Sequence, residues 1–355
     1  MTLHENKALF KDAVFATASQ KNLPDMYIEK DYWVTLALYT IFKSDIGSQV
    51  VFKGGTALSK CFQAIERFSE DIDLVVLRNE GELDSHLTKK IKPIGMSIEA
   101  ILPEIEVEGI THKRGKIRKT AHSYNRIFDG DLGQIRDYIV LEATWLGHFE
   151  PYTTSYIQSF ITEMMLNAGQ KGLIEEYHLQ PFDVRVLTIE RTFCEKIMSL
   201  VRFSFTEQPI IDLNKKVRHI YDIHKLLENE ATCVFFDSNR FDEMLLKVAN
   251  DDIISFKNNN SWLSNHPVKA IIFSDITNTW HLIRETYNTT FKDLVFGKLP
   301  SENEILGTLQ RVANRLKDIT WTIKVDFDKK AIVEKLFSMN TRELSELIEE
   351  VQSKL

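Results

Sequence analysis

The chain has 355 residues, enough for two domains or one large one, and 43% of them are hydrophobic, which argues against wholesale disorder. Its 44 basic and 51 acidic residues leave a net charge of −7, which argues against a protein that coats nucleic acid broadly but permits a local basic groove. The start of the chain does not resemble a signal peptide, no apolar run approaches the length of a membrane span, and Cys61, Cys194 and Cys233 show neither a metal-binding spacing nor a disulfide framework. The sequence therefore predicts a soluble protein of the cytoplasm, where thiols are kept reduced.

Two helices are predicted first, over residues 5–19 and 27–43, and the second carries an aromatic-rich apolar face. That face is formed by Tyr27, Tyr32, Trp33, Leu36 and Tyr39. Three consecutive charged residues, Glu29, Lys30 and Asp31, interrupt the apolar pattern. They could simply solvate the helix surface, which we expect for Glu29, whereas Lys30 stays open.

A pair of glycines follows the next predicted strand. Residues 50–53 form a short apolar run that ends at Gly54 and Gly55, which is typical of a buried strand meeting a tight turn. Because glycine lacks Cβ, the backbone of this turn can take positive φ and come close to a ligand. Thr56 is placed to cap the helix that follows, and a helix N-terminus behind a glycine turn suits phosphate.

Two carboxylates stand at the start of another predicted strand. Residues 72–77 are apolar on both faces of that strand, which indicates a buried position. Asp71 and Asp73 are two residues apart and are therefore expected to point to the same face. Two acids at the mouth of a buried strand are costly unless a positive partner neutralises them, and such oxygen ligands favour Mg²⁺, with Mn²⁺ as the alternative.

The glycine turn, the helix and the acidic strand follow in a fixed order, with fifteen residues from Thr56 to Asp71. A GG-[ST] turn followed by a helix and a strand with D-x-D resembles the nucleotidyltransferase superfold of DNA polymerase β. The longer strings KGGTALSK and RFSEDIDL are similar to the AbiEii/AbiGii toxin family of nucleotidyltransferases, in which EKDYW also recurs. The alternative is an ordinary βαβ unit whose acidic strand end is neutralised by salt bridges.

A basic stretch follows the acidic strand, in a polar segment with helical spacing over residues 80–101 and in the segment 112–119. Its cations are Lys89, Lys90, Lys92, Lys113, Arg114, Lys116, Arg118 and Lys119. Such a cluster could hold a polyanion through its phosphates, and Tyr124 and Arg126 could stack on a base or pair with a phosphate. A solvated basic loop explains the same residues equally well.

A lone acid, Glu142, lies within the apolar segment 137–148, which is predicted to contain a central strand. In the resembled superfold a third carboxylate sits on a strand beside the D-x-D strand, which makes Glu142 the candidate for that position. The alternative is a glutamate on an edge strand that faces water.

A strong amphipathic helix is predicted from Thr188 to about residue 203, after a helix over 156–168 and a short strand over 184–187. Its string ERTFCEKI resembles the third motif of the AbiEii-like toxins, in which a lysine faces the active site. The resemblance therefore assigns Lys196 a contact with the triphosphate. The alternative is a solvated Lys196 beside a helical pair of Arg191 and Glu195.

The next helix, predicted over residues 214–228, places Arg218 and Asp222 four residues apart on one face. The fourth motif of the family has an arginine and an aspartate at this spacing, which assigns Asp222 to the site. The usual acidic residue after the arginine is replaced here by His219. An ordinary helical pair of Arg218 and Asp222 is the alternative.

The C-terminal third is predicted to be mostly helical, and its last helix follows Asn340 with Glu343 completing a capping box. The apolar stripe of that helix consists of Leu344, Leu347, Ile348, Val351 and Leu355. We expect the stripe to pack on the chain's own core.

These patterns predict an α+β fold, with a mixed sheet of the nucleotidyltransferase type, flanking helices and a mostly helical C-terminal domain. The predicted domains are residues 1–187, which hold the nucleotidyltransferase sheet and the N-terminal helices, and residues 188–355, which contribute to the active site.

The resemblance implies a toxin of a bacterial toxin–antitoxin or phage-defence system that transfers a nucleoside monophosphate from a nucleoside triphosphate to an acceptor. tRNA 3′ ends are one acceptor class, and a separately encoded antitoxin is the expected partner. The predicted catalytic residues, of which the first three would bind the metal, are Asp71, Asp73, Glu142, Lys196 and Asp222. The predicted phosphate contacts are Gly54, Gly55, Thr56, Lys60 and Ser69. Two other classes stay open: a nucleotide sensor without turnover, and a D-x-D sugar transferase that would not need the two glycines.

Overall fold

The computed structural model describes residues 1–113, 115–128, 135–147, 149–256 and 259–325, together with residues 340, 344, 345 and 348. Most of the final helix predicted after Asn340 therefore lies outside the described residues, as does Arg114 of the basic stretch. None of the described helices is long and apolar enough to span a bilayer.

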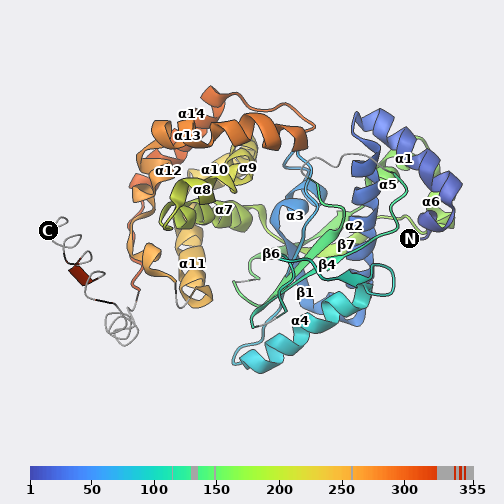
Figure 1. The fold of residues 1–355 in the computed structure, drawn as a ribbon, viewed down its shortest axis with the longest axis horizontal. Coiled ribbons are helices and arrows are strands. Elements are labelled where there is room, and N and C mark those ends of the chain that lie inside the picture. Colours follow the sequence, from blue (N-terminus) through green and yellow to red (C-terminus); the bar gives the residue numbers. More distant parts are fainter. Residues whose placement is uncertain are drawn as a thin grey trace.

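A seven-stranded mixed sheet forms the centre of the N-terminal part, with the strand order β3-β4-β5-β2-β1-β7-β6 (Figure 1). The strands are β1 (Val50–Lys53), β2 (Ile72–Val76), β3 (Glu104–Ile105), β4 (Ile117–His122), β5 (Ile139–Thr144), β6 (Tyr152–Ile157) and β7 (Phe182–Leu187). β1 and β2 are antiparallel, whereas β2 pairs with β5 and β1 pairs with β7 in parallel. The predicted mixed sheet is confirmed, and β5 lies between β4 and β2 instead of at an edge.

Helices cover this sheet and close its core. They are α1 (Lys7–Lys21), α2 (Asp25–Lys43), α3 (Gly54–Lys60), α4 (Asp84–Ile98), α5 (Phe160–Asn167) and α6 (Lys171–Glu176). α2 and α4 contact each other and the sheet, and their buried residues join those of the strands in one apolar cluster. The predicted helices are confirmed, but α5 begins at residue 160 because the preceding YTTSYI segment, rich in β-branched and aromatic residues, pairs with β7 as strand β6.

The remaining helices gather beside the sheet as a second group (Figure 1). They are α7 (Ile189–Ser204), α8 (Pro209–Asn214), α9 (Val217–Leu227), α10 (Glu230–Phe236), α11 (Asn239–Ser255), α12 (Ile271–Ser274), α13 (Ile276–Thr286) and α14 (Glu302–Lys317). α7 begins where Thr188 accepts a hydrogen bond from the backbone N–H of Arg191, and it packs against α8, α9 and α11. This group has its own apolar cluster, which Leu58 of α3 and Ile65 join from the N-terminal part.

The three charged residues of α2 are buried, so the expectation that Glu29 lies on a solvated helix surface was wrong. Glu29 accepts hydrogen bonds from the backbone N–H groups of Ile127 and Phe128, at 2.7 and 3.2 Å. Lys30 forms an ion pair with Glu70 at 2.8 Å. Each charge is buried because it has a specific partner, which a helical spacing pattern cannot show.

Candidate active site

A row of four charged residues crosses the middle of the sheet on neighbouring strands. The strand registers pair Lys119 of β4 with Glu142 of β5, Glu142 with Asp73 of β2, and Asp73 with Lys53 of β1. Residues paired across neighbouring strands project from the same face, so these side chains lie in one line. The row therefore places two acids side by side between two cations, and it brings together Asp73 and Glu142 as predicted from the sequence.

The glycine turn closes on one end of this row. Gly54 has a φ of +82°, and a Cβ atom added there would collide with the carboxylate of Asp73. A Cβ atom on Gly55 would come within 2.7 Å of Arg67 Nη2 and 2.9 Å of Ser69 Oγ. Both positions thus need glycine for a close approach, and the turn lies against the acidic strand.

Thr56 does not cap helix α3, because the helix already begins at Gly54 and Lys53 occupies the N-cap position. Instead, its side-chain hydroxyl donates a hydrogen bond to Ser69 Oγ at 3.0 Å. The structure therefore joins the two predicted hydroxyl residues to each other next to Gly55.

The two central acids repel one another. Burial, the charge of Glu142 and the charge of Asp71 raise the pKa of Asp73 to about 7. Glu142 has a cationic neighbour in Lys119, with 3.3 Å between Nζ and Oε2. Paired carboxylates in which one has a strongly raised pKa are suited to bind a divalent cation, and their oxygen atoms match Mg²⁺ or Mn²⁺.

Asp71, the third predicted metal ligand, points to an arginine. Its Oδ1 atom lies 2.7 Å from Arg136 Nη1, and Arg136 also approaches Glu70 Oε1 at 3.4 Å. Within the described ranges no three His, Cys, Asp or Glu side chains already stand together as a metal-binding group. Two of the three predicted ligands are therefore adjacent, and the third would have to turn from Arg136 to join them.

A buried ionic triad links the glycine turn to the helical part. Both oxygens of Asp222 on α9 accept hydrogen bonds from Arg67, at 2.7 and 2.8 Å, and Oδ2 also accepts one from Lys196 of α7 at 2.6 Å. Burial alone would raise the pKa of Asp222, but the charges of Arg67 and Lys196 outweigh it and hold the pKa at about 2. Lys196 is thus buried and paired, so the solvated-lysine alternative is wrong; Asp222 binds Arg67 and Lys196 instead of Arg218.

A second set of ion pairs joins the same helix to the end of β1. Glu195 of α7 lies 3.6 Å from Lys53 and 3.0 Å from Arg191, which confirms the predicted helical pair of Arg191 and Glu195. Arg191 also contacts Asp251 at 2.7 Å. The row of charges and the glycine turn are therefore both connected to α7.

Comparison with known proteins identifies the family of this arrangement. Residues 36–307 match the profile of the nucleotidyl transferase AbiEii toxin of a type IV toxin–antitoxin system. The chain belongs to the AbiEii family of nucleotidyltransferase toxins. No protein of curated function matches the chain by sequence.

Two solved structures are similar to this chain at low sequence identity, to different degrees. MenT4, a nucleotidyltransferase toxin from Mycobacterium tuberculosis, is 13% identical, with a TM-score of 0.51 over 94% of this chain and 99% of that one. JHP933 from Helicobacter pylori is 12% identical, with a TM-score of 0.38 over 89% of this chain and 100% of that one. The AbiEii-family chain described here thus shares its fold with MenT4 over nearly its whole length.

Lys60 is the predicted phosphate contact that the structure places elsewhere. Its Nζ atom binds Asp31 Oδ1 at 2.5 Å and Thr35 Oγ1 at 2.8 Å, at the end of α3 that is remote from the glycine turn. The amine therefore fastens α3 to α2 in this structure.

The predicted basic stretch is largely ion-paired in this member of the AbiEii family. Lys90 binds Glu82, both Lys113 and Arg118 bind Glu104, and Lys116 lies over the ring of Trp145. Lys119 is the member that reaches the row of charges. The described residues of the stretch are thus divided between helix α4 and the hairpin of β3 and β4.

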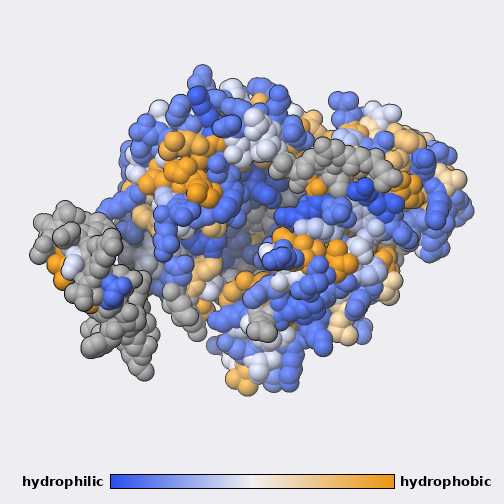
Figure 2. Space-filling view, viewed as in Figure 1, coloured by the Kyte–Doolittle hydropathy of each residue, from blue (hydrophilic) through white to orange (hydrophobic). Residues whose placement is uncertain are grey.

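Other cations lie at the start of α9 in the helical part. Lys216, just before α9, has a pKa lowered to about 8 by burial and by the charges of Arg202, Arg218 and Lys119. Lys216 Nζ lies 4.7 Å from the centre of the Phe203 ring. Figure 2 shows the surface hollowed between the sheet part and the helical part, so a polyanion could enter from solvent there.

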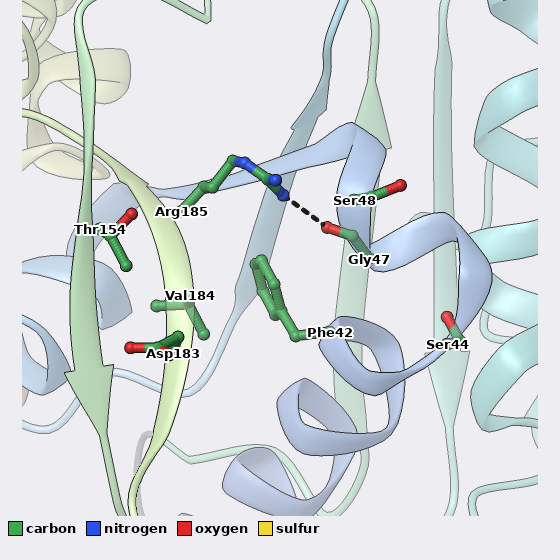
Figure 3. A pocket seen from close by; sticks show the side chains of 8 residues that line it. All are labelled: Phe42, Ser44, Gly47, Ser48, Thr154, Asp183, Val184 and Arg185. Atoms are coloured by element: carbon green, nitrogen blue, oxygen red, sulfur yellow. Dashed lines mark hydrogen bonds between the residues drawn. The ribbon is translucent and has the colours of Figure 1, made fainter.

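Two cavities lie away from this site. One, of about 320 Å³, is lined by residues of α2, β6 and β7, and Figure 3 shows Arg185 donating a hydrogen bond to the carbonyl of Gly47 beside it. The other, of about 430 Å³, lies between α1 and α2 beside Trp33 and Arg126. Neither is lined by a predicted catalytic residue or by a residue of the glycine turn, and the second is lined by Arg126, which the sequence offered as a possible contact for a base or phosphate.

Sequence reasoning gave no role to Lys53, Arg67 or Arg136. The first two lie within the quoted strings KGGTALSK and RFSEDIDL, so their place beside the motif was a signal that could have been used. Arg136 lies far from the acidic strand in sequence, and only the fold brings it to Asp71.

Proposed function

We propose that this toxin transfers a nucleoside monophosphate from a nucleoside triphosphate to an acceptor in a reaction that needs Mg²⁺ or Mn²⁺. The observation that carries the proposal is the row in which Asp73 and Glu142 lie side by side against the glycine turn. Asp71, Asp73 and Glu142 would hold the metal. A metal held there would supply a lower pKa for the attacking hydroxyl and positive charge for the triphosphate, in an in-line displacement at the α-phosphate with pyrophosphate as the leaving group.

The glycine turn and its two hydroxyl residues would bind the phosphates. Backbone N–H groups of Gly54 and Gly55 can approach a phosphate closely because neither residue carries Cβ. The hydroxyls of Thr56 and Ser69, which already contact each other, lie beside this turn. Together these groups would orient the triphosphate toward the acids.

The triad beneath the turn would position the cations of the site. Asp222 is fully enclosed, so we assign it the role of holding Arg67 and Lys196 in place. Arg67 lies against Gly55, and Lys196 would offset phosphate charge from the helical side. The two parts of the chain would therefore complete one site.

The acceptor would be RNA, with the tRNA 3′ end as the favoured class. Lys216 and Arg218 on the helical side and Lys119 of the sheet supply positive charge. Such charges would bind the phosphates of an RNA without distinguishing one base from another. The match to a toxin of a toxin–antitoxin system supports a separately encoded antitoxin as the partner and growth arrest in the cytoplasm as the outcome.

The proposal is tested by incubating the protein with Mg²⁺, each labelled nucleoside triphosphate and total RNA, and comparing the native chain with Asp71→Ala and Asp73→Asn. Labelled RNA is expected with the native chain only. Asp45→Asn, which alters an exposed acid away from the row, serves as the matched control and should behave as the native chain.

Failure to label any RNA or protein with any of the four nucleotides would contradict nucleotidyl transfer. Nucleotide binding without product would favour the sensor. The sugar-transferase alternative has no use for the tight contact of Gly54 and Asp73, and it would be supported by binding of a nucleotide sugar.

A further inference from the structure

Arg136 shares its guanidinium between two neighbouring acids. Nη1 lies 2.7 Å from Asp71 Oδ1 and 3.4 Å from Glu70 Oε1, and the backbone N–H of Arg136 donates to the same Glu70 oxygen at 3.2 Å. The contact with Asp71 is the shorter one. Arg136 therefore holds an oxygen of a predicted metal ligand while it keeps a second partner within reach.

The position of Arg136 is fixed from the inside of the protein. Lys30, which has no exposed side-chain surface, binds Glu70 and donates to the backbone carbonyls of Arg136 and Tyr138. Glu70 is in turn nearly buried. Since one lysine holds both Glu70 and the backbone of Arg136, the guanidinium can move from Asp71 to Glu70 by a side-chain rotation alone, without a shift of the backbone.

We propose that Arg136 is a positioning residue that competes with the divalent ion for Asp71 and so sets the metal affinity of the site. Ion binding turns Asp71 toward Asp73 and Glu142, and Arg136 then keeps Glu70 as its partner. This inference rests on the proposed function, because it takes the three carboxylates as the metal ligands.

Charge decides the direction of the effect. A guanidinium a few ångströms from the acids repels a divalent ion, whereas the orienting effect of one hydrogen bond on Asp71 is weaker. The side chain of Arg136 is 31% exposed, so solvent screens part of the repulsion. Removing the charge is therefore expected to tighten metal binding about tenfold.

The experiment is a titration of the full-length protein with Mn²⁺ alone, in which free Mn²⁺ is followed by electron paramagnetic resonance. Arg136→Met and Arg136→Gln should each bind about tenfold more tightly than the native chain, whereas Arg136→Lys, which restores the charge, should bind within about threefold of it. Arg284→Met, which removes a charge of α13 paired with Glu302, is the matched control and should leave the affinity unchanged.

Unchanged or weaker Mn²⁺ binding in both neutral variants would overturn the inference. Asp73→Asn should abolish the binding, which assigns the measured site to the row of charges. If the native chain binds Mn²⁺ through Asp73 but transfers no nucleotide, the proposed function fails while the role of Arg136 stands. If Asp73→Asn binds as the native chain does, the proposed metal site fails and the inference fails with it.

Discussion

Two acids of the same residue type, Asp222 and Asp73, meet opposite electrostatic surroundings in this molecule. Asp222 is enclosed and has a guanidinium and an ammonium group within hydrogen-bonding distance, which hold its pKa at about 2. Asp73 lies between Glu142 and Lys53 in the row, and burial and the charges of Glu142 and Asp71 outweigh the charge of Lys53 and raise its pKa to about 7. The comparison teaches that an acid bound directly by two cations holds the fold together, whereas an acid whose surroundings disfavour its charge is available for a cationic ligand.

The largest expected effect is the loss of transfer in Asp73→Asn. Asparagine keeps the shape that fits against Gly54 but removes the negative charge, so the rate of nucleotidyl transfer should fall by at least about 10³-fold. The melting temperature, measured in EDTA, should stay equal to that of the native chain or rise, because a repulsive charge is removed. A variant that lost both activity and stability would show that Asp73 is structural and would break the comparison.

The next largest expected effect is a loss of stability in Asp222→Asn. It leaves Arg67 and Lys196 buried without their counter-ion, which should lower the free energy of unfolding by about 3–5 kcal/mol. Urea denaturation measures this loss. The control is the single variant Asp212→Asn, because Asp212 forms an ion pair with the exposed Lys215. An unchanged urea midpoint would mean that the triad contributes nothing to the fold.

The pH dependence of stability should have opposite signs for the two acids. The pKa of Asp73 is raised in the folded chain, so its unfavourable contribution to stability grows as the pH rises from about 4 to about 7, by roughly 3 kcal/mol. The pKa of Asp222 is lowered, so its favourable contribution is present above about pH 4 and is lost as the pH falls toward 2.

Urea unfolding of the native chain and Asp73→Asn in EDTA, near pH 5 and near pH 8, tests the first part. The stability advantage of Asp73→Asn should be larger near pH 8. An equal advantage at both values would show that Asp73 is already ionised near pH 5.

The smallest expected effect on stability is that of a substitution in the glycine turn. Gly54→Ala places a Cβ against the carboxylate of Asp73 at a positive φ, so it should cost about 1 kcal/mol more than Gly81→Ala. Gly81 has a similar φ of +74° but nothing within 4 Å, which makes it the matched control. Thermal unfolding compares the two variants, and transfer should be lost only in Gly54→Ala. Equal losses of stability would mean that Asp73 can move aside.

The fold and half of the site were predictable because their signals are local in sequence. Apolar runs, the glycine pair and the spacing of Asp71 and Asp73 predicted the central strands, and the register that sets Glu142 beside Asp73 confirmed the expected neighbour. The ion-pair partners of the buried charged residues could not be predicted from local sequence patterns. Whether a charged residue of a helix faces water or a buried counter-ion depends on elements that arrive from elsewhere in the chain, as Lys30 and Glu70 show.

The resemblance to the AbiEii-like toxins identified residues that lie together, but it did not identify all of their contacts. It led to Lys196 and Asp222, which the structure brings together, whereas the alternative had paired Asp222 with Arg218, four residues away on the same helix. The observed partner is Arg67, 155 residues away in sequence. A helical spacing rule sees only the chain's own surface, whereas buried charges are satisfied across the packing of separate elements.

The contact of Arg67 with Asp222 also limits how the molecule can be divided. A fragment ending at residue 187 would contain the whole sheet and the glycine turn, yet the guanidinium beneath that turn would lose the carboxylate that balances it. We therefore expect such a truncated protein to be recovered as an insoluble or misassembled product, and co-expression of the missing helices in trans to restore it. Any engineered split of this enzyme would better keep α7 and α9 with the strands.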